Sequence, residues 1–184
     1  MAFVASEGQV RQLAAQVREA TTSSIGITSD YSTTYAEIWK RHSSVRTVTS
    51  FLARNIASLG LHAFRRVSDI DRERLTDHPL PVLLNRPNAY TTRFRMFSSL
   101  VHDLGIFDDA YWVKVKTANG ISLMRLAPQN VTVHGDSMLV PDAYEVRGAK
   151  GKRVYPRDQV IHFRGYSPDS LTGSSPIESL RQVL

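Results

Sequence analysis

The sequence contains no cysteine. This absence excludes a disulfide scaffold, a thiol nucleophile and a cysteine-ligated zinc or iron site. Long hydrophobic runs are also missing, since no apolar stretch approaches the roughly 20 residues that a membrane-spanning helix needs. The first residues lack the basic region and long apolar core of a signal peptide. We therefore expect a soluble intracellular protein with no membrane partner.

The common enzyme motifs are absent as well. The sequence has no glycine-rich phosphate loop of the Walker or Rossmann form, no Gly-x-Ser-x-Gly elbow and no His-Glu-x-x-His helix. His162 lies in an apolar stretch, which favours a structural imidazole over a ligand. The pair Asp108-Asp109 lacks a third acid at a diagnostic spacing, which favours turn aspartates with solvated charge. Asp69 and Asp71 have Arg72, Glu73 and Arg74 beside them, which also favours solvated loop charges. We predict no enzyme activity, no catalytic residue, no metal ligand and no cofactor. A metal-dependent nuclease using Asp108, Asp109 and a histidine is the least favoured alternative.

Positive charge is in excess. The net charge is +6 and the pI is near 9.8, which favours acidic partners such as nucleic acid. The basic residues form only small clusters at Lys40-Arg41, Arg65-Arg66 and residues 150–153. An ordinary solvated surface is the preferred interpretation. The alternative is a nucleic-acid-binding module in which Tyr35 and Trp39 stack on bases, although this spacing is also typical of core or subunit-interface aromatics. Which residues would contact nucleic acid is unknown at this stage.

The chain is long enough for one good core, and its 42% hydrophobic and 22% charged residues are typical of a globular domain. Ser6 and Gln9 form a capping box that predicts a helix over residues 7–20. Residues 21–34 are rich in Ser and Thr, which indicates a flexible linker. We therefore expect residues 1–34 to form an N-terminal helix and linker, separate from the domain that follows.

From Tyr35 the pattern is helical again, and Gly60 is placed to end the helix. Its apolar residues recur in steps of three and four, which predicts a core-facing stripe made of Val45, Val48, Leu52, Ile56 and Leu59. Residues 61–67 alternate as a strand does. Residues 69–77 are expected to form a charged connection.

Residues 77–88 form a proline-bracketed elbow. Pro79 and Pro81 favour the start of a short helical turn, and Arg86-Pro87 ends it, because a residue before proline avoids the α region. Val82, Leu83 and Leu84 give this turn an apolar face, and we expect the leucines to be core. After it, Thr91 or Thr92 caps a helix that Gly105 stops, with a buried stripe made of Phe94, Phe97, Leu100, Val101 and Leu104.

The second half is rich in predicted strands. Asn119-Gly120 is a strong hairpin signal between strands 110–116 and 121–126. Further short strands are predicted at 131–134, 138–140, 143–147, 153–155 and 160–164. An α+β fold follows, with helices packed on one face of a twisted, mainly antiparallel sheet over residues 35–174. Ser175, Pro176 and Glu178 form a helix start. We expect residues 175–184 to begin a longer helix and the sequence to be the front part of a longer protein.

An ordered set of motifs resembles the portal proteins of tailed bacteriophages, in the HK97-like family. The motifs are His78-Pro79-Leu80, Leu83-Leu84-Asn85-Arg86-Pro87-Asn88, Ala110-Tyr111, Leu126-Ala127-Pro128-Gln129-Asn130-Val131, Tyr155-Pro156-Arg157-Asp158-Gln159-Val160-Ile161-His162-Phe163 and Gly173-Ser174-Ser175-Pro176-Ile177. The resemblance extends from about Tyr35 to the end of the chain. Many portals read Gly-Asn-Ala-Tyr where this chain has Asp108-Asp109-Ala110-Tyr111, so we expect the local turn to differ.

This resemblance implies a mechanical function. Portals form rings, usually of twelve subunits, at one capsid vertex, and double-stranded DNA passes through the ring. The terminase motor, the capsid and the tail connector proteins are the implied partners, in a tailed phage or prophage. The implied location is the virion, with the bacterial host cytoplasm during assembly. The chain would correspond to the wing region, ending as the first stem helix starts and before the clip and crown. Portals hydrolyse nothing themselves.

Overall fold

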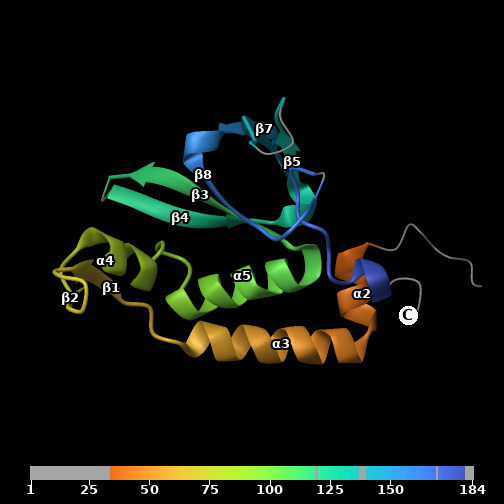
Figure 1. The fold of residues 1–184 in the computed structure, drawn as a ribbon. Coiled ribbons are helices and arrows are strands. Elements are labelled where there is room, and N and C mark those ends of the chain that lie inside the picture. Colours follow the sequence, from red (N-terminus) through yellow and green to blue (C-terminus); the bar gives the residue numbers. More distant parts are fainter. Residues whose placement is uncertain (1–33, 119, 137–139, 169, 181–184) are drawn as a thin grey trace, which may run out of the picture. The chain divides into compact units, whose positions relative to one another are not determined.

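The computed structural model describes residues 34–118, 120–136, 140–168 and 170–180. The chain divides into two units, residues 1–33 and 34–184, and the predicted helix 7–20 and the linker before Thr34 lie outside the described residues. The second unit combines helices with antiparallel sheets, which confirms the α+β prediction (Figure 1). Among the described residues, no helix is both long and apolar enough to cross a membrane.

Two helices replace the single helix predicted from Tyr35. Helix α2 spans Tyr35–Arg41 and begins with a capping box between Thr34 and Glu37. The backbone of His42 is extended, with φ −97° and ψ 109°, and helix α3 then spans Ser43–Ser58. The break at His42 lets the two helices run in different directions, and both contact helix α5, which spans Arg93–Phe107.

The predicted core stripe of α3 is wrong apart from its first residue. Val45 is buried, together with Thr49, Ala53 and Ala57. The other members of the stripe are exposed: Val48 by 58%, Leu52 by 47%, Ile56 by 46% and Leu59 by 64%. The reason is that α3 packs on α5 through small side chains. Small side chains allow the two helix backbones to approach closely. The face of α3 that α5 covers is therefore the one with the small residues, and most of the large apolar residues lie beside that face.

Gly105 supports that close approach instead of ending α5. A Cβ atom at Gly105 would lie 3.3 Å from Cγ2 of Thr49. The absence of a side chain at Gly105 therefore leaves room for Thr49 of α3. Thr92 caps α5 by accepting a hydrogen bond from the Arg95 amide, and the helix continues to Phe107. Of its predicted stripe, Leu100 is buried, Phe97 and Leu104 are partly buried against the core, and Phe94 is 44% exposed.

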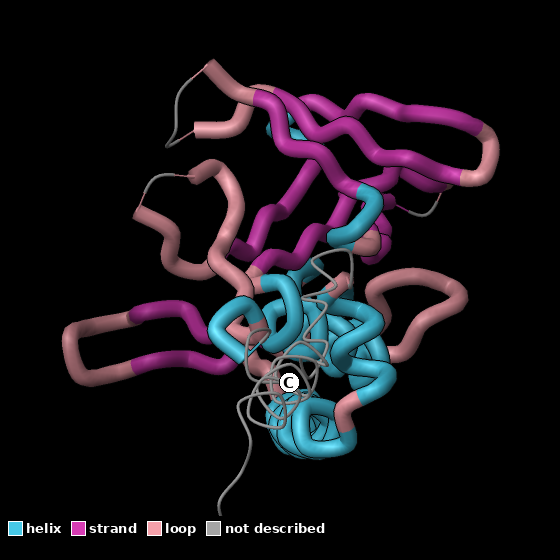
Figure 2. Tube along the Cα trace, turned by 90° about the vertical axis from the view of Figure 1, so that its right-hand side faces the viewer, coloured by secondary structure: helices cyan, strands magenta, loops and turns pink. Residues whose placement is uncertain are grey.

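The charged connection predicted at 69–77 contains a strand. Strand β1 spans Ala63–Arg66 and pairs in antiparallel fashion with strand β2, Arg72–Leu75. Both faces of this hairpin are largely exposed, so its sequence has no apolar alternation by which a strand is recognised. Figure 2 shows the hairpin standing away from the helices and from the other strands.

The proline-bracketed elbow is the short helix α4, Pro79–Asn85. Its N-cap is His78, whose ring Nδ1 accepts a hydrogen bond from the Leu80 amide at 3.2 Å. Leu83 packs against the main core cluster, as expected, whereas Val82 is 59% exposed and not part of the core.

The end of the elbow docks on the edge of strand β4, Gly120–Leu126. The Leu123 amide donates to the Pro87 carbonyl at 2.7 Å, and the Asn88 side-chain amide donates to the Leu123 carbonyl, also at 2.7 Å. Pro87 is fully buried. The elbow therefore pairs with part of a sheet edge that would otherwise be open.

The remaining strands form two separate three-stranded antiparallel sheets in place of the single sheet predicted. One sheet has the order β4-β3-β8, with β3 at Asp109–Thr117 and β8 at Val160–Arg164. The other has the order β5-β6-β7, made of Val131–His134, Ala143–Gly148 and Gly151–Pro156. Of the strand predicted at 138–140, residues 138 and 139 lie outside the described residues and Val140 is not in a strand.

Strand β3 lies at the centre of the core. Ala110 and Trp112 face one side and join Met96 and Leu100 of α5 in the main cluster. Tyr111 faces the other side, where it packs with Tyr144 of β6 and Val160. The first five residues of β3 are therefore all buried, because helices cover one face of its sheet and the second sheet covers the other (Figure 1).

Of the helix predicted from Ser175, the described residues show a short 3-10 turn, Glu178–Leu180, and residues 181–184 lie outside the described part. The Ser175 hydroxyl accepts a hydrogen bond from the Ile177 amide at 3.2 Å and donates one to the Ile106 carbonyl at the end of α5. Ile177 is 2% exposed and packs with Ile38, Val45 and Ile106. The segment after β8 is thus fixed to the helices through the side chains of Ser175 and Ile177.

We expect Leu83→Ala to lower the free energy of unfolding by about 2 kcal/mol, because the change leaves a gap against the main core cluster. Val82→Ala, one residue away in the same helix, is the matched control and should cost less than about 0.5 kcal/mol, because its side chain is mostly in water. Urea denaturation followed by tryptophan fluorescence measures both. Equal losses in the two variants would show that the elbow does not contribute to the core through Leu83.

Candidate functional site

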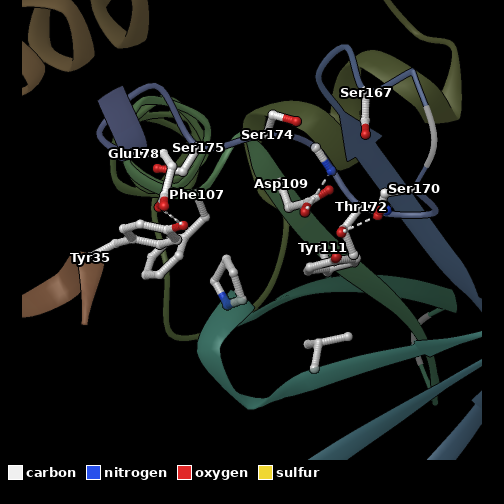
Figure 3. Close-up of a pocket in the computed structure, with 13 residues that line it drawn as sticks. Tyr35, Phe107, Asp109, Tyr111, Ser167, Ser170, Thr172, Ser174, Ser175 and Glu178 are labelled. Carbon is white, nitrogen blue, oxygen red and sulfur yellow. Dashed lines mark hydrogen bonds between the residues drawn. The ribbon is translucent and has the colours of Figure 1, made fainter. Parts of the chain in front are cut away.

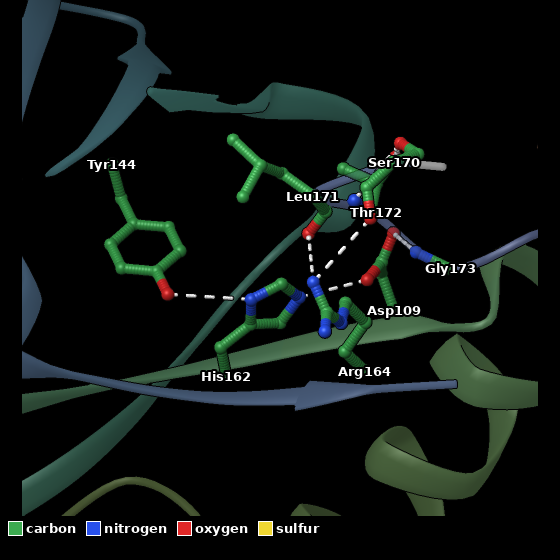
Figure 4. A network of polar contacts seen from close by, with 8 residues as sticks. All are labelled: Asp109, Tyr144, His162, Arg164, Ser170, Leu171, Thr172 and Gly173. Atoms are coloured by element: carbon green, nitrogen blue, oxygen red, sulfur yellow. Dashed lines mark hydrogen bonds and ion pairs between the residues drawn. The ribbon is translucent and has the colours of Figure 1, made fainter. Parts of the chain in front are cut away.

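A buried pair of ionisable side chains joins strands β3 and β8. Oδ1 of Asp109 lies 2.8 Å from Nε2 of His162, and both side chains are only 8% exposed. Tyr111 is the cross-strand partner of His162, so their side chains share a face of the sheet. Asp109 lies two residues before Tyr111 in the same strand, so its side chain is on that face too, which meets the second sheet. Figure 4 shows this network of polar contacts.

Further contacts extend the pair to two other parts of the chain. Oδ2 of Asp109 accepts a hydrogen bond from the Gly173 amide at 2.9 Å, and the Tyr144 hydroxyl lies 3.3 Å from Nδ1 of His162. The ring of Tyr111 stacks on His162 with centroids 4.4 Å apart. We call Asp109, Tyr111, Tyr144 and His162 the central network. It connects β3, β6, β8 and the segment that follows β8.

A neighbouring arginine strengthens the connection to that segment. The Arg164 guanidinium donates to the backbone carbonyls of Ser170 and Leu171 at 3.4 and 3.5 Å (Figure 4). Asp109 holds the Gly173 amide two residues further on. The segment between β8 and the final turn is therefore held through its backbone at several points.

The electrostatics of the central network keep its phenols neutral. Burial raises the pKa of Tyr111, and the negative charge of Asp109 raises it further. Burial also raises the pKa of the Tyr144 hydroxyl. Tyr144 therefore retains a proton that it can donate to His162. Because one ring nitrogen of His162 contacts Asp109 and the other contacts Tyr144, neither is available to activate a nucleophile without breaking the network.

The prediction that His162 is a structural imidazole agrees with this geometry. The interpretation of Asp109 as a solvated turn residue is wrong, because its side chain is buried and bonded on both oxygens. The two residues are 53 positions apart. The register of β3 against β8 brings them together, and no local motif in the sequence records that register.

Asp108 forms the turn between α5 and β3. Its backbone has φ 59°, a left-handed conformation that glycine adopts more readily than other residues do. The Gly165 amide donates to the Asp108 carbonyl at 2.8 Å, and a side chain at Gly173 would lie 2.2 Å from that same carbonyl oxygen. Burial, and then the charge of Asp109, raises the pKa of the Asp108 carboxyl. Among the described residues, no three His, Asp or Glu side chains are grouped so that they can hold a metal ion.

A pocket of about 420 Å³ lies beside the central network (Figure 3). Its apolar wall includes Tyr35, Phe107 and Tyr111, and its polar side includes Asp109 and Glu178. Tyr35 and Phe107 meet edge to face at 6.2 Å, and the Tyr35 hydroxyl donates to the Glu178 carboxylate. The start of α2, the end of α5 and the final described turn thus form part of the pocket lining.

Tyr35 and Trp39 do not form an exposed stacking pair. Both are partly buried against the cluster that contains Ile38 and Val45. The Trp39 indole donates to the Thr49 hydroxyl at 2.9 Å, and the Arg46 guanidinium lies 5.2 Å above the Trp39 ring. The interpretation of these aromatics as packing residues therefore agrees with the structure.

A group of exposed apolar side chains lies on α3 and at its C-cap residue. It consists of Val48, Phe51, Leu52, Ile56 and Leu59, exposed by 46% to 64%, and we call it the α3 stripe. No charged residue belongs to it. The two arginines of α3 are engaged elsewhere, Arg46 over Trp39 and Arg54 with the Ser50 carbonyl at 3.3 Å. A neutral apolar strip of this kind is typical of a surface that another protein covers.

Comparison with known families gives a match over residues 43–184 to the family described as phage portal protein. The fold is similar to that of a chain in the neck of an empty GTA particle computed with C6 symmetry, with a TM-score of 0.64 and 18% identity over 79% of this chain and 41% of that chain. The fold is also similar to that of a chain in the neck of a native GTA particle computed with C12 symmetry. That match has a TM-score of 0.59 and 18% identity, and it covers 85% of this chain and 40% of the other.

A third similar structure comes from the virion of a native gene transfer agent particle, with a TM-score of 0.57 and 21% identity over 73% of this chain and 36% of that chain. The chain therefore spans between 36% and 41% of the length of these solved chains. At these identities the likeness shows the fold. No curated protein matches the sequence significantly.

Removing the Asp109 carboxylate should destabilise the fold strongly. We expect Asp109→Ala to lower the free energy of unfolding by about 3 kcal/mol, because it leaves His162 and the Gly173 amide buried without their partner. Asp158→Ala removes an exposed carboxylate and should change stability by less than about 0.5 kcal/mol. Thermal and urea unfolding compare the two variants. A small loss in Asp109→Ala would mean that the central network does not hold the sheets together.

Proposed function

Because the chain belongs to the phage portal protein family, a family of structural proteins, we propose that it is part of a subunit that assembles into a ring at one vertex of a virion. The structures with the same fold belong to the necks and virion of GTA particles, two of them computed with C6 or C12 symmetry. A ring of about twelve subunits is the assembly that the resemblance of the sequence implies.

The α3 stripe is the observation that carries this proposal. Each subunit of a ring contacts a neighbour on either side through two different surfaces, so a large part of its outside is covered. The stripe leaves several large apolar side chains in water when the chain is alone. Burial against another subunit removes that surface from water and stabilises the assembly.

The proposed partners are further copies of the subunit, the capsid, the terminase motor and the tail connector proteins, with double-stranded DNA passing through the ring. The proposed location is the virion, after assembly in the host cytoplasm. We propose no reaction for the chain. The boundaries at residues 34 and 174, and a stem helix beginning at 175, remain predictions.

The third alternative, a metal-dependent nuclease using Asp108, Asp109 and a histidine, gains no support. Both oxygens of Asp109 are occupied by His162 and the Gly173 amide, and the Asp108 carbonyl accepts the Gly165 amide. These contacts close a turn and link β3 to β8 and to the segment that follows β8.

The test is assembly of the protein expressed from its complete reading frame, imaged by negative-stain electron microscopy. We expect rings for the unaltered protein. Leu52→Lys places a charge in the α3 stripe and should weaken association roughly tenfold or more, because the ammonium group loses water on contact. Thr47→Lys adds the same charge at an exposed position of α3 outside the stripe and should still give rings.

Absence of rings from the unaltered protein would contradict the proposed function. Rings in normal number from Leu52→Lys would instead show that the α3 stripe lies outside the contact between subunits. Circular dichroism of both variants separates these outcomes from loss of folding, which we do not expect at half-exposed positions.

A further inference from the structure

The β1–β2 hairpin separates its charges between its two faces. Cross-strand partners share a face, and the register pairs Phe64 with Arg74 and Arg66 with Arg72. Phe64, Arg66, Arg72 and Arg74 therefore lie on one side, which we call the arginine face. The other side carries Arg65 and Glu73, an exposed ion pair at 3.9 Å.

The arginine face holds positive charges close together. Arg66 and Arg72 are directly opposite each other, and like charges at such positions repel. Arg66 has a carboxylate partner in Asp69 of the turn, which is itself 90% exposed. Arg74 contacts the ring Nδ1 of His62 at 2.7 Å, a group that supplies no negative charge. No acidic residue of either strand lies on this face, because the one acidic strand residue, Glu73, is on the other side.

The hairpin is also accessible. Figure 2 shows it standing clear of the helices and of the two larger sheets. The Arg66 side chain is 71% exposed and Phe64 is 53% exposed. A two-stranded hairpin alone is only marginally stable in water, so a ligand that neutralises the repelling arginines would also stabilise its shape.

We propose that the arginine face binds the phosphate backbone of duplex DNA. Guanidinium groups match phosphate oxygens in shape and charge, and a two-stranded ribbon is of a size that the major groove admits. Phe64 adds an exposed aromatic ring beside the three arginines. The choice of DNA over another polyanion rests on the proposed function, in which DNA passes the assembled subunits. Contacts to phosphates carry no sequence information, so the binding is independent of DNA sequence.

The experiment measures binding of the 184-residue chain to a fluorescent 30-base-pair duplex as salt is raised from about 50 to 200 mM. Three phosphate contacts give a slope of log K against log salt of about −2.7, which weakens binding roughly 40-fold over this range. The triple variant Arg66→Gln, Arg72→Gln and Arg74→Gln should reduce the magnitude of the slope by about 2.7. Its affinity at 50 mM salt should fall about tenfold or more.

Two control variants remove positive charge outside the arginine face. One removes as many charges as the arginine-face variant, and the other removes fewer. The triple variant Lys150→Gln, Lys152→Gln and Arg153→Gln removes three charges from the β6–β7 hairpin, and Arg65→Gln removes one from the opposite face of the β1–β2 hairpin. Both should bind DNA with a slope close to that of the unaltered chain. The substitutions are at exposed positions, and circular dichroism confirms folding.

Equal slopes in the two triple variants would overturn the proposal, as would no binding by the unaltered chain at 50 mM salt. In a competition assay, poly-glutamate and unlabelled duplex are compared at equal charge. If poly-glutamate displaces the fluorescent duplex as effectively as unlabelled duplex does, the site binds acidic polypeptides and the assignment to DNA is overturned. Ring assembly is measured by microscopy and DNA binding by titration of the isolated chain, so failure of this inference is distinct from failure of the proposed function.

Discussion

The double-sided burial of strand β3 is the constraint on which the rest of the structure depends. Its even-numbered residues need helix α5 and its odd-numbered residues need the second sheet, because both faces carry large aromatic side chains. The helices, the β4-β3-β8 sheet and the β5-β6-β7 sheet therefore stack in that order. Asp109 and His162 lie at the second of these boundaries. Their polar contacts are possible there because both carboxylate oxygens of Asp109 and both ring nitrogens of His162 have a partner.

Much of this arrangement follows from local sequence. The strands at 131–134 and 160–164 have the predicted bounds, and β3 and β4 pair in antiparallel fashion as the hairpin signal predicts, although Asn119 itself lies outside the described residues. The proline elbow is a short helix with its end fixed on β4. These elements are predictable because turn chemistry and alternation act over a few residues. The resemblance to portals, based on several motifs in order, agrees with the family match and with the folds of the neck structures.

The features that sequence reasoning misread depend on distant neighbours. The spacing of Val48, Leu52, Ile56 and Leu59 shows correctly that α3 has an apolar side, but periodicity does not say whether the covering surface comes from the same chain. Gly105 looks like a helix stop, yet its function is to admit Thr49 of α3. The Asp109–His162 contact requires the register of two strands that are far apart in sequence. None of these relations is local.

The two largest errors share a physical cause. The sequence predicts that the stripe on α3 is core and that strand β2 is a charged connection. Both lack a full set of contacts within the described chain. Helix α3 exposes apolar side chains, and β1 and β2 expose both faces. Residues that contact a partner follow the same rules of burial and charge as residues of a core. The groups that cover or neutralise them, however, lie on another molecule. Disagreement between local pattern and observed burial therefore marks the surfaces at which partners are to be sought. For this chain those surfaces are the neutral α3 stripe, suited to protein, and the arginine face, suited to phosphate.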